Sequence, residues 1–443
     1  MIFSSIQFLI FFLIFLIFLK IFKNNQRSII ILFSIFFYGF WNPSFTFLVF
    51  FFFITSYFFL KEDFSLKVSI PIILLPLFYF KYSFFIANLS GIKILMDFSY
   101  TGNLPLAISF ITFTVIAILV DVKTKKYKEE INFFSLSEFL IYFPQLIAGP
   151  ILRAKELIPV LKNKIIFTQT NVKFGILLFM IGFIKKIFFA DSISNYIDPI
   201  FNKENLTASS DYIKGFLLFP LQIYFDFSGY IDMAIGISKI LNIDLPINFN
   251  KPYLSSSLTE FWRNWHITLS KWFRDYIYIP LGGSKHGNKK LFSNLFLTMS
   301  IAGLWHGASI NFILWGSLNG ILLFLEKKLN MYFNFNKIIK IFLTCFLVFN
   351  LWVIFRINDL NFLLIFYNNL YLNFFTIIET ENLILLILVI TAVASQKFDN
   401  YNYIENFSKK FNFLVLVPIF VAVLITGLAI KAGSSEKFIY FDF

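Results

Sequence analysis

Residues 261–307 begin FWRNWHITLSKWFRDYIYIPLGGSKHG and end GLWHG. They contain all three histidines of the chain and four of its seven tryptophans: His266, His286, His306, Trp262, Trp265, Trp272 and Trp305. A histidine within an apolar chain that has almost no others is a sharp functional signal. The sequence therefore predicts that the chemistry of the protein lies in this stretch, and that the rest of the chain holds it in place.

The composition of the chain is that of a membrane protein. Of its 443 residues, 58% are hydrophobic and 14% are charged, whereas soluble domains have about 25% charged residues. Water could not solvate the surface of such a fold, so lipid must be the solvent for most of it. The apolar runs are continuous, as at 8–19 and 383–390, and lack the alternation of β-barrel strands. We therefore expect an all-α polytopic protein in the lipid bilayer.

The net charge of +13 comes from Lys and Arg in short clusters between the apolar runs. Cytoplasmic loops carry this positive excess, so the pattern indicates topology and not nucleic-acid binding. Basic clusters at 20–27, 61–67 and 123–128 follow the first, third and fifth apolar runs. This arrangement predicts that the N-terminus lies outside and that each Lys-rich loop is cytoplasmic.

A helix needs about 20 apolar residues to cross the bilayer, and counting such runs predicts about 11–12 spans. They are expected near 4–22, 28–42, 44–60, 68–85, 104–120, 172–190, 212–240, 291–305, 307–326, 338–355, 382–395 and 411–431. Prolines interrupt the run in 136–165, which predicts a re-entrant segment. Residues 359–376 are expected in the interface. We expect one domain, 1–443, with N-terminal helices at 1–135, a catalytic core at 136–330 and C-terminal helices at 331–443.

An amphipathic helix is expected inside the opening stretch. Ser257 and Glu260 form a capping-box pattern at its start, and Pro280 stops it. The apolar side chains between these points follow helical spacing, while basic side chains fall on another side. Such a helix suits the cytoplasmic interface or a pore mouth. The sequence thus predicts one helix through 262–278, with His266 near its start.

His306 is the first candidate for chemistry. It follows an apolar run, 291–305, that is too short to cross the bilayer alone, so we expect it inside the membrane region. A neutral imidazole can take a proton from a hydroxyl as that oxygen attacks an acyl carbon. The alternative is a histidine hydrogen-bonded between packed helices. His266 either orients a substrate or caps a polar pocket, and His286, in a polar loop, is assigned no role.

Two carboxylates, Asp226 and Asp232, interrupt the apolar run 212–240. A charge at membrane depth is costly, so each should face a polar interior or a basic partner. The three histidines and the single Cys345 form no metal-ligand pattern, and no phosphate loop or nucleophile elbow is present. The sequence therefore favours direct transfer assisted by a base, with no bound cofactor or metal.

Four blocks carry a resemblance to a known family. They are YFPQLIAGPILR (142–153), DFSGYIDMAIG (226–236), NFNKPYLSSSLTEFWRNWHITLSKWFRDYIYIPLGG (248–283) and LWHGASINFILWG (304–316). In this order they resemble the membrane-bound O-acyltransferase (MBOAT) family, in the bacterial branch that O-acetylates alginate, peptidoglycan and other surface polysaccharides. The closing FIYFDF is similar to that branch's tail, whereas the N-terminal third matches in hydropathy only.

The resemblance implies a ring of tilted helices around a central funnel in the bacterial cytoplasmic (inner) membrane. His306 would be the catalytic histidine and His266 the second histidine. Acetyl-CoA would enter from the cytoplasm, and the acetyl group would pass to a surface polysaccharide, often through a periplasmic or extracellular SGNH-type acetyltransferase partner. Basic groups that could attract CoA phosphates are Arg263, Arg274, Lys285, Lys289 and Lys290. Tunnel-lining candidates from the matched blocks are Gln145, Asp226, Ser228, Asp232, Trp262, Trp265, Trp305 and Asn311.

Peptidoglycan is the expected acceptor, because a compact chain suits a simple two-protein system. Alginate acetylation and D-alanyl transfer to teichoic acid are the alternatives within the family, and the turn IPLGG at 279–283 looks more like the acetylating branch. The alternative from another class is a proton-coupled transporter or flippase with Asp226, Asp232 and His306 as a relay. Transporters often have paired halves with matching broken spans, and the sequence has no such repeat.

Overall fold

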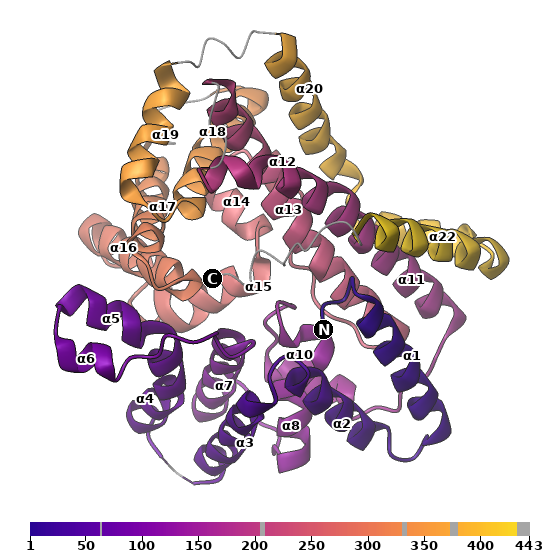
Figure 1. Ribbon diagram of the computed structural model, residues 1–443. Coiled ribbons are helices and arrows are strands. Elements are labelled where there is room, and N and C mark those ends of the chain that lie inside the picture. The colour runs from indigo at the N-terminus through magenta and orange to yellow at the C-terminus, as the bar shows by residue number, and fades with distance from the viewer. Residues whose placement is uncertain (63, 204–208, 330–334, 373–379, 432–443) are drawn as a thin grey trace. The chain divides into compact units, whose positions relative to one another are not determined.

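The structure, a computed structural model, describes the chain except for residues 63, 204–208, 330–334, 373–379 and 432–443 (Figure 1). The described residues form helices joined by turns and loops, with no strand among them. The predicted all-α fold class is therefore confirmed. The closing FIYFDF lies outside the described residues.

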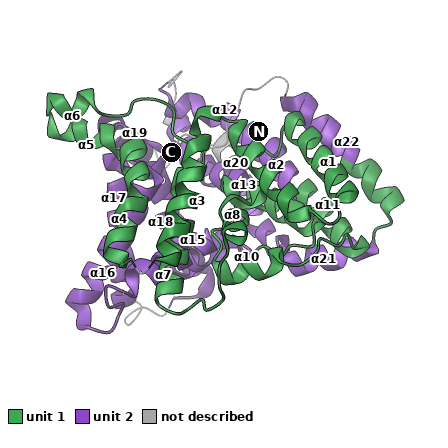
Figure 2. Ribbon diagram, turned by 90° about the horizontal axis from the view of Figure 1, so that it is seen from below, with its two compact units in different colours: residues 1–180, 230–246, 411–420 green, residues 181–229, 247–410, 421–443 purple. Residues whose placement is uncertain are grey.

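The chain folds into two compact units whose segments alternate along the sequence (Figure 2). One unit comprises 1–180, 230–246 and 411–420, and the other comprises 181–229, 247–410 and 421–443. The helices α11, α13 and α22 contribute residues to both units. These boundaries cut across the three segments expected from the sequence, and the single catalytic domain stays a prediction.

In the first unit the apolar runs of the N-terminal third form helices close to the expected positions. They are α1 (Ile6–Ile21), α2 (Gln26–Gly39), α3 (Thr46–Lys61), α4 (Leu66–Leu77), α5 (Ser83–Ser90), α6 (Lys93–Asp97), α7 (Ile108–Lys123), α8 (Phe133–Ile141), α9 (Phe143–Leu146), α10 (Ala154–Leu161) and α11 (Gln169–Ile184). Polar side chains start several of them. The hydroxyl of Ser5 accepts the Phe8 N–H at 3.2 Å, and Asn132 accepts the Ser135 N–H at 2.8 Å, each satisfying an amide at a helix start.

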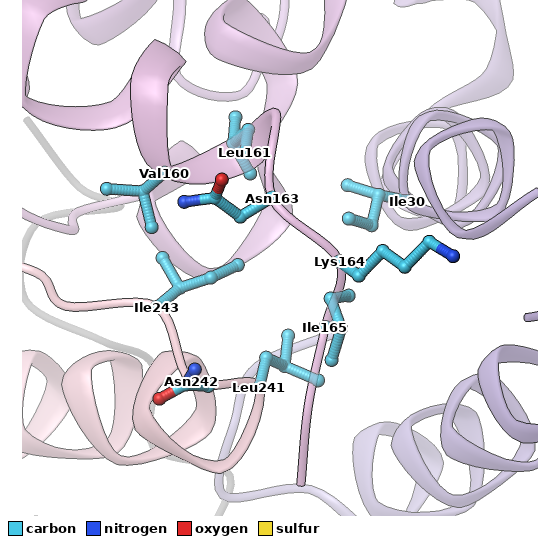
Figure 3. Close-up of a pocket in the computed structure, with 9 residues that line it drawn as sticks. All are labelled: Ile30, Val160, Leu161, Asn163, Lys164, Ile165, Leu241, Asn242 and Ile243. Carbon is cyan, nitrogen blue, oxygen red and sulfur yellow. The ribbon is translucent and has the colours of Figure 1, made fainter.

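The predicted interruption after residue 136 is present. The helix α8 ends at Ile141, and Pro144 lies in the single turn of α9. The side-chain amide of Gln145 donates to the carbonyl of Phe139 at 2.7 Å, which satisfies a backbone acceptor near the end of α8. A small pocket of about 50 Å³ lies in the same unit beside α10, where Val160 and Asn163 face Ile243 (Figure 3).

The second unit carries the opening stretch of the sequence. Its helices are the π-helix η3 (Lys185–Ala190), α12 (Asp191–Phe201), α13 (Ser209–Ile240, shared), α14 (Leu258–Asn264), α15 (Ile267–Phe273), the π-helix η5 (Arg274–Tyr278), α16 (Gly287–His306), α17 (Ile310–Leu329), α18 (Lys337–Arg356), α19 (Leu360–Leu372), α20 (Thr380–Ser395), α21 (Tyr401–Lys410) and α22 (Phe413–Lys431, shared). The start of α14 is capped as expected, because the Ser257 hydroxyl accepts the Glu260 N–H at 3.0 Å.

The expectation of one amphipathic helix through 262–278 is wrong. The helix α14 ends at Asn264, and Trp265 is extended. His266 then adopts a left-handed conformation with φ 44° and ψ 56°, and α15 begins at Ile267. No Gly or Pro marks this break, so the spacing of apolar residues could not reveal it. The break places His266 between two short helices, α14 and α15.

The helices α16 and α17 are packed backbone to backbone. A methyl group added to Gly303 would lie 2.1 Å from the carbonyl oxygen of Phe312, and one added to Gly316 would lie 2.2 Å from that of Met299. Only glycine permits this approach, so the two residues fix the distance between the helices. The helix that contains the expected run 291–305 is longer than that run: α16 has 20 residues and is about 30 Å long. Its length therefore does not place His306 inside the membrane, and that depth stays a prediction.

Among the described residues, four helical runs are long and apolar enough to cross a membrane: Pro43–Lys61, Leu66–Ser90, Lys337–Arg356 and Phe413–Lys431. A fifth is added if Leu383–Phe398 and Tyr401–Lys410, bent by 70°, form one span. Several other expected spans are shorter or more polar helices, such as α1 with 16 residues. The count of about 11–12 spans stays a prediction.

Candidate active site

His306 is the last residue of α16, and its imidazole lies within a set of aromatic rings. It is buried, and its ring lies nearly perpendicular to three neighbours. The centroid distances are 4.9 Å to Trp305, 5.2 Å to Trp315 and 5.2 Å to Phe355. These rings come from α16, α17 and α18, so three helices fix the orientation of one histidine.

His266 is buried beside the same rings. Its imidazole lies 4.8 Å from the ring of Phe227 and 6.2 Å from that of Trp305, and only 1% of the residue is exposed. Neither ring nitrogen has a hydrogen-bond partner in another described residue. Burial lowers the pKa of His266 to about 3, so the imidazole is neutral at physiological pH. A neutral ring offers one donor and one acceptor to a substrate.

Two further tryptophans of the stretch, Trp262 and Trp265, extend this aromatic cluster. The indole N–H of Trp262 donates to the side-chain oxygen of Asn319 at 3.2 Å, and its ring lies 5.7 Å from Trp315. Trp265 packs 4.9 Å from Trp352, which stacks on Trp315 at 5.9 Å. The helices α14, α17 and α18 are thus joined by aromatic contacts on the side of His306.

Asn311 connects α17 to the end of α18. Its side-chain amide is fully buried and donates to the carbonyls of Ile354 at 3.3 Å and Phe355 at 3.4 Å. Because Phe355 is one of the rings around His306, this residue positions the cluster. These bonds give Asn311 a structural role in the cluster. Its predicted tunnel-lining role stays a prediction.

Asp226 has a structural partner. The ammonium of Lys186 lies 2.7 Å from the Asp226 carboxylate and 2.6 Å from that of Asp191, and all three side chains are buried. This ion pair is the basic partner that the sequence left open, and the tunnel-lining role of Asp226 stays a prediction. It also explains why Lys186 occurs in an otherwise apolar run. Ser228 is buried two residues further along α13.

Gln145 and Asp232 belong to the first unit, where both are buried. The basic candidates of the second unit are exposed: Arg263, Arg274, Lys285, Lys289 and Lys290. Of these, Arg274 is paired with Asp275 at 2.8 Å. Among the described residues, no group of three His, Cys, Asp or Glu side chains could hold a metal ion.

Sequence reasoning missed several residues of the cluster. Trp315 lies in the quoted block 304–316 and, with Asn319 one helical turn later, shares a face of α17, so helical spacing could have found the pair. Phe355 and Trp352 are ordinary members of an apolar run, and nothing in the sequence sets them apart. Lys186 lies in the expected span 172–190, and nothing in the sequence names its carboxylate partners.

The chain matches the family model described as MBOAT, membrane-bound O-acyltransferase family, over residues 76–367. It is 42% identical over 306 residues to the Pseudomonas putida protein named "Probable alginate O-acetylase AlgI", covering 67% of this chain and 62% of that protein. It is 39% identical over 317 residues to a Helicobacter pylori peptidoglycan O-acetyltransferase, covering 64% and 60%. It is 29% identical over 242 residues to a Bacillus subtilis teichoic acid D-alanyltransferase, covering 50% and 60%.

These matches span about 60% of the length of each relative. The matched family region contains both buried histidines and the aromatic cluster around them. Together with the apolar helices, it identifies a multi-pass membrane protein. The chain belongs to the membrane-bound O-acyltransferase family.

Proposed function

We propose that this protein is an O-acyltransferase that moves an acetyl group from cytoplasmic acetyl-CoA toward a cell-surface polysaccharide. The observation that carries the proposal is the buried His306 within its aromatic cluster, in a chain of this family. Relatives named for alginate and for peptidoglycan are nearly equally similar, at 42% and 39% identity. Peptidoglycan is the acceptor we propose to test first, and alginate is the second.

In the proposed reaction His306 is the general base. As a hydroxyl oxygen of the acceptor attacks the thioester carbonyl, a C–O bond forms and the imidazole takes the hydroxyl proton. The C–S bond then breaks, and the proton passes to the departing sulfur, giving free CoA. The surrounding rings exclude water, which would otherwise compete as the nucleophile. The neutral His266 would hold the substrate by hydrogen bonding.

The donor and the partner follow from the same proposal. The exposed basic groups would attract the phosphates of CoA by charge: Arg263 in α14, Arg274 in η5, Lys285, and Lys289 and Lys290 at the start of α16. The acceptor would be reached directly or through a periplasmic or extracellular SGNH-type acetyltransferase. We place the protein in the bacterial cytoplasmic membrane with its N-terminus outside. D-alanyl transfer to teichoic acid is the alternative within the family, supported by relatives at 29% and 30% identity.

The transporter alternative receives less support. It needs Asp226 to carry protons in a relay with His306. The Lys186 ammonium at 2.7 Å instead holds the Asp226 carboxylate in a buried ion pair, which supports a structural role for Asp226.

The test expresses the wild type, His306→Ala and His306→Gln in bacterial cells and measures base-labile acetyl ester on isolated peptidoglycan and alginate. Loss of a general base is expected to lower acetylation by about 10²–10⁴-fold. His286→Ala is the matched control, because that histidine is exposed in a loop. Equal acetylation by wild type and both His306 variants would sink the proposal. D-alanyl ester on teichoic acid in place of acetyl ester would redirect it to the alternative.

A further inference from the structure

His266 occupies the capping position of α15 without capping it. A polar residue before the first turn of a helix commonly accepts the N–H of the second or third helical residue with its own side chain. His266 makes no such bond, and its backbone is left-handed. Left-handed backbone is uncommon outside glycine and is often found where a side chain has a functional direction. Another group must therefore satisfy the amides at the start of α15 and hold this turn.

Asn248 supplies those bonds from the segment that precedes α14, 20 residues before Thr268. Its backbone carbonyl accepts the N–H of Ile267 at 3.0 Å. Its side-chain oxygen accepts the N–H of Thr268 at 2.9 Å and the Thr268 hydroxyl at 3.0 Å. Ile267 and Thr268 are the first two residues of α15. Asn248 thus performs the capping that would otherwise fall to the imidazole of His266.

A further backbone bond holds the two segments together. The N–H of Asn250 donates to the carbonyl of Asn264, the last residue of α14, at 3.0 Å. Residues 248–250 therefore contact the chain on both sides of the break, before Trp265 and after His266. Asn248 is fully buried, so no solvent competes for these bonds.

We propose that Asn248 is the positioning residue of His266: by capping α15 in its place, it fixes the left-handed turn and leaves the imidazole available to the substrate. The proposal rests on the proposed function, because it assigns His266 a role in that site. Asn248 also retains a donor, since its side-chain nitrogen has no hydrogen-bond partner among the described residues. The capping role and this donor are separable by substitution. Asn248→Ala removes both, whereas Asn248→Asp keeps the accepting oxygen.

The experiment measures CoA release from acetyl-CoA by the full chain in proteoliposomes that contain peptidoglycan disaccharides. A misplaced imidazole is expected to lower kcat of Asn248→Ala by up to about 10²-fold, with KM for acetyl-CoA nearly unchanged. Asn248→Asp is expected to recover most of the rate. The matched control is Asn294→Ala, another buried asparagine that bonds a backbone carbonyl, that of Gly283, at 2.8 Å. It should lose a similar amount of thermal stability and keep its rate.

A double-substitution cycle separates positioning from general stability. If Asn248 acts through His266, adding Asn248→Ala to His266→Ala lowers the rate no further, and the two effects are not additive. Three results would overturn the inference: rate losses that multiply in the double variant, an unchanged rate in Asn248→Ala, or a rate of Asn248→Asp no higher than that of Asn248→Ala. In each case transfer by the wild type still supports the proposed function. If the wild type transfers no acetyl group, the proposed function fails. Hydrogen exchange at the Ile267 and Thr268 amides, expected to accelerate in Asn248→Ala, then decides the capping role alone.

Discussion

His266 and His306 pack against one indole ring, that of Trp305, at centroid distances of 6.2 Å and 4.9 Å. They reach it from different elements, since His266 precedes α15 and His306 ends α16. A single side chain therefore sets the spacing between the two histidines of the candidate site. This relationship gives the first prediction.

Trp305→Ala is expected to lower acetyl transfer strongly and to destabilise the protein by about 3–5 kcal/mol, the usual cost of removing a buried tryptophan. Trp305→Phe keeps a ring between the histidines and should retain most of the activity. Thermal unfolding in detergent and acetyl ester formation are the two measurements. The control is Trp272→Ala, a buried tryptophan that contacts Phe273 and Tyr276. Equal loss of activity per folded molecule in both alanine variants would contradict a specific role for Trp305.

Lys186→Met is expected to destabilise the protein by about 3–5 kcal/mol, because it leaves the buried carboxylates of Asp191 and Asp226 without their shared cation. The melting temperature measures this. Adding Asp191→Asn and Asp226→Asn should restore much of the loss by removing the excess buried negative charge. Lys203→Met is the comparison, since its ion pair with Asp359 is exposed and its removal should leave the melting temperature unchanged. A stable Lys186→Met would show that the buried pair does not support the fold.

The buried His266 makes stability depend on pH in a defined window. Its pKa is about 3 in the folded protein and 6.5 in the reference state, so the unfolded chain binds more protons between these values. Stability is therefore full above pH 6.5 and falls as the pH is lowered toward 3. Asparagine tolerates the left-handed backbone and does not titrate. His266→Asn should therefore reduce the fall in melting temperature between about pH 7 and pH 4.5. His286→Asn should leave the slope of the wild type intact, and an identical slope in both variants would refute the assignment.

Replacing Arg263, Lys285, Lys289 and Lys290 by Gln is expected to raise KM for acetyl-CoA by about tenfold, since exposed charge attracts an anionic ligand. The difference from the wild type should shrink as salt is added, because these side chains are screened. Lys125→Gln with Lys128→Gln, in a different basic loop, provides the control. An unchanged KM in the fourfold variant would leave these residues with a topological role only.

The sequence predicted the larger elements of the fold well, and the local ones less well. Continuous apolar runs mark helices such as α1 and α7 within a few residues, because burial in lipid requires apolar side chains all round. The break at His266 was missed, since it is stabilised by bonds from Asn248, which lies outside both short helices and 20 residues before Thr268. Periodicity records only local spacing and carries no trace of such a contact.

The candidate site was predicted in the same uneven way. Scarcity of histidine pointed to His306 and His266, and the structure places both against Trp305. The partner of Asp226 could not be named, because an ion pair depends on which helices pack together and not on spacing. Phe355 was invisible for a similar reason: it is one phenylalanine among 67. Its role beside His306 arises from the packing of α18.

The glycine contacts between α16 and α17 have a mechanical consequence. No layer of side chains separates Gly303 from Phe312, or Gly316 from Met299, so the two helices cannot slide past each other and move as one rigid unit. This rigid pair of helices carries Trp305, His306 and Trp315. Opening of the cluster to admit a bulkier acceptor therefore needs movement of an element outside this pair, such as α18, and Phe355 is a position to substitute when testing for a wider range of acceptors.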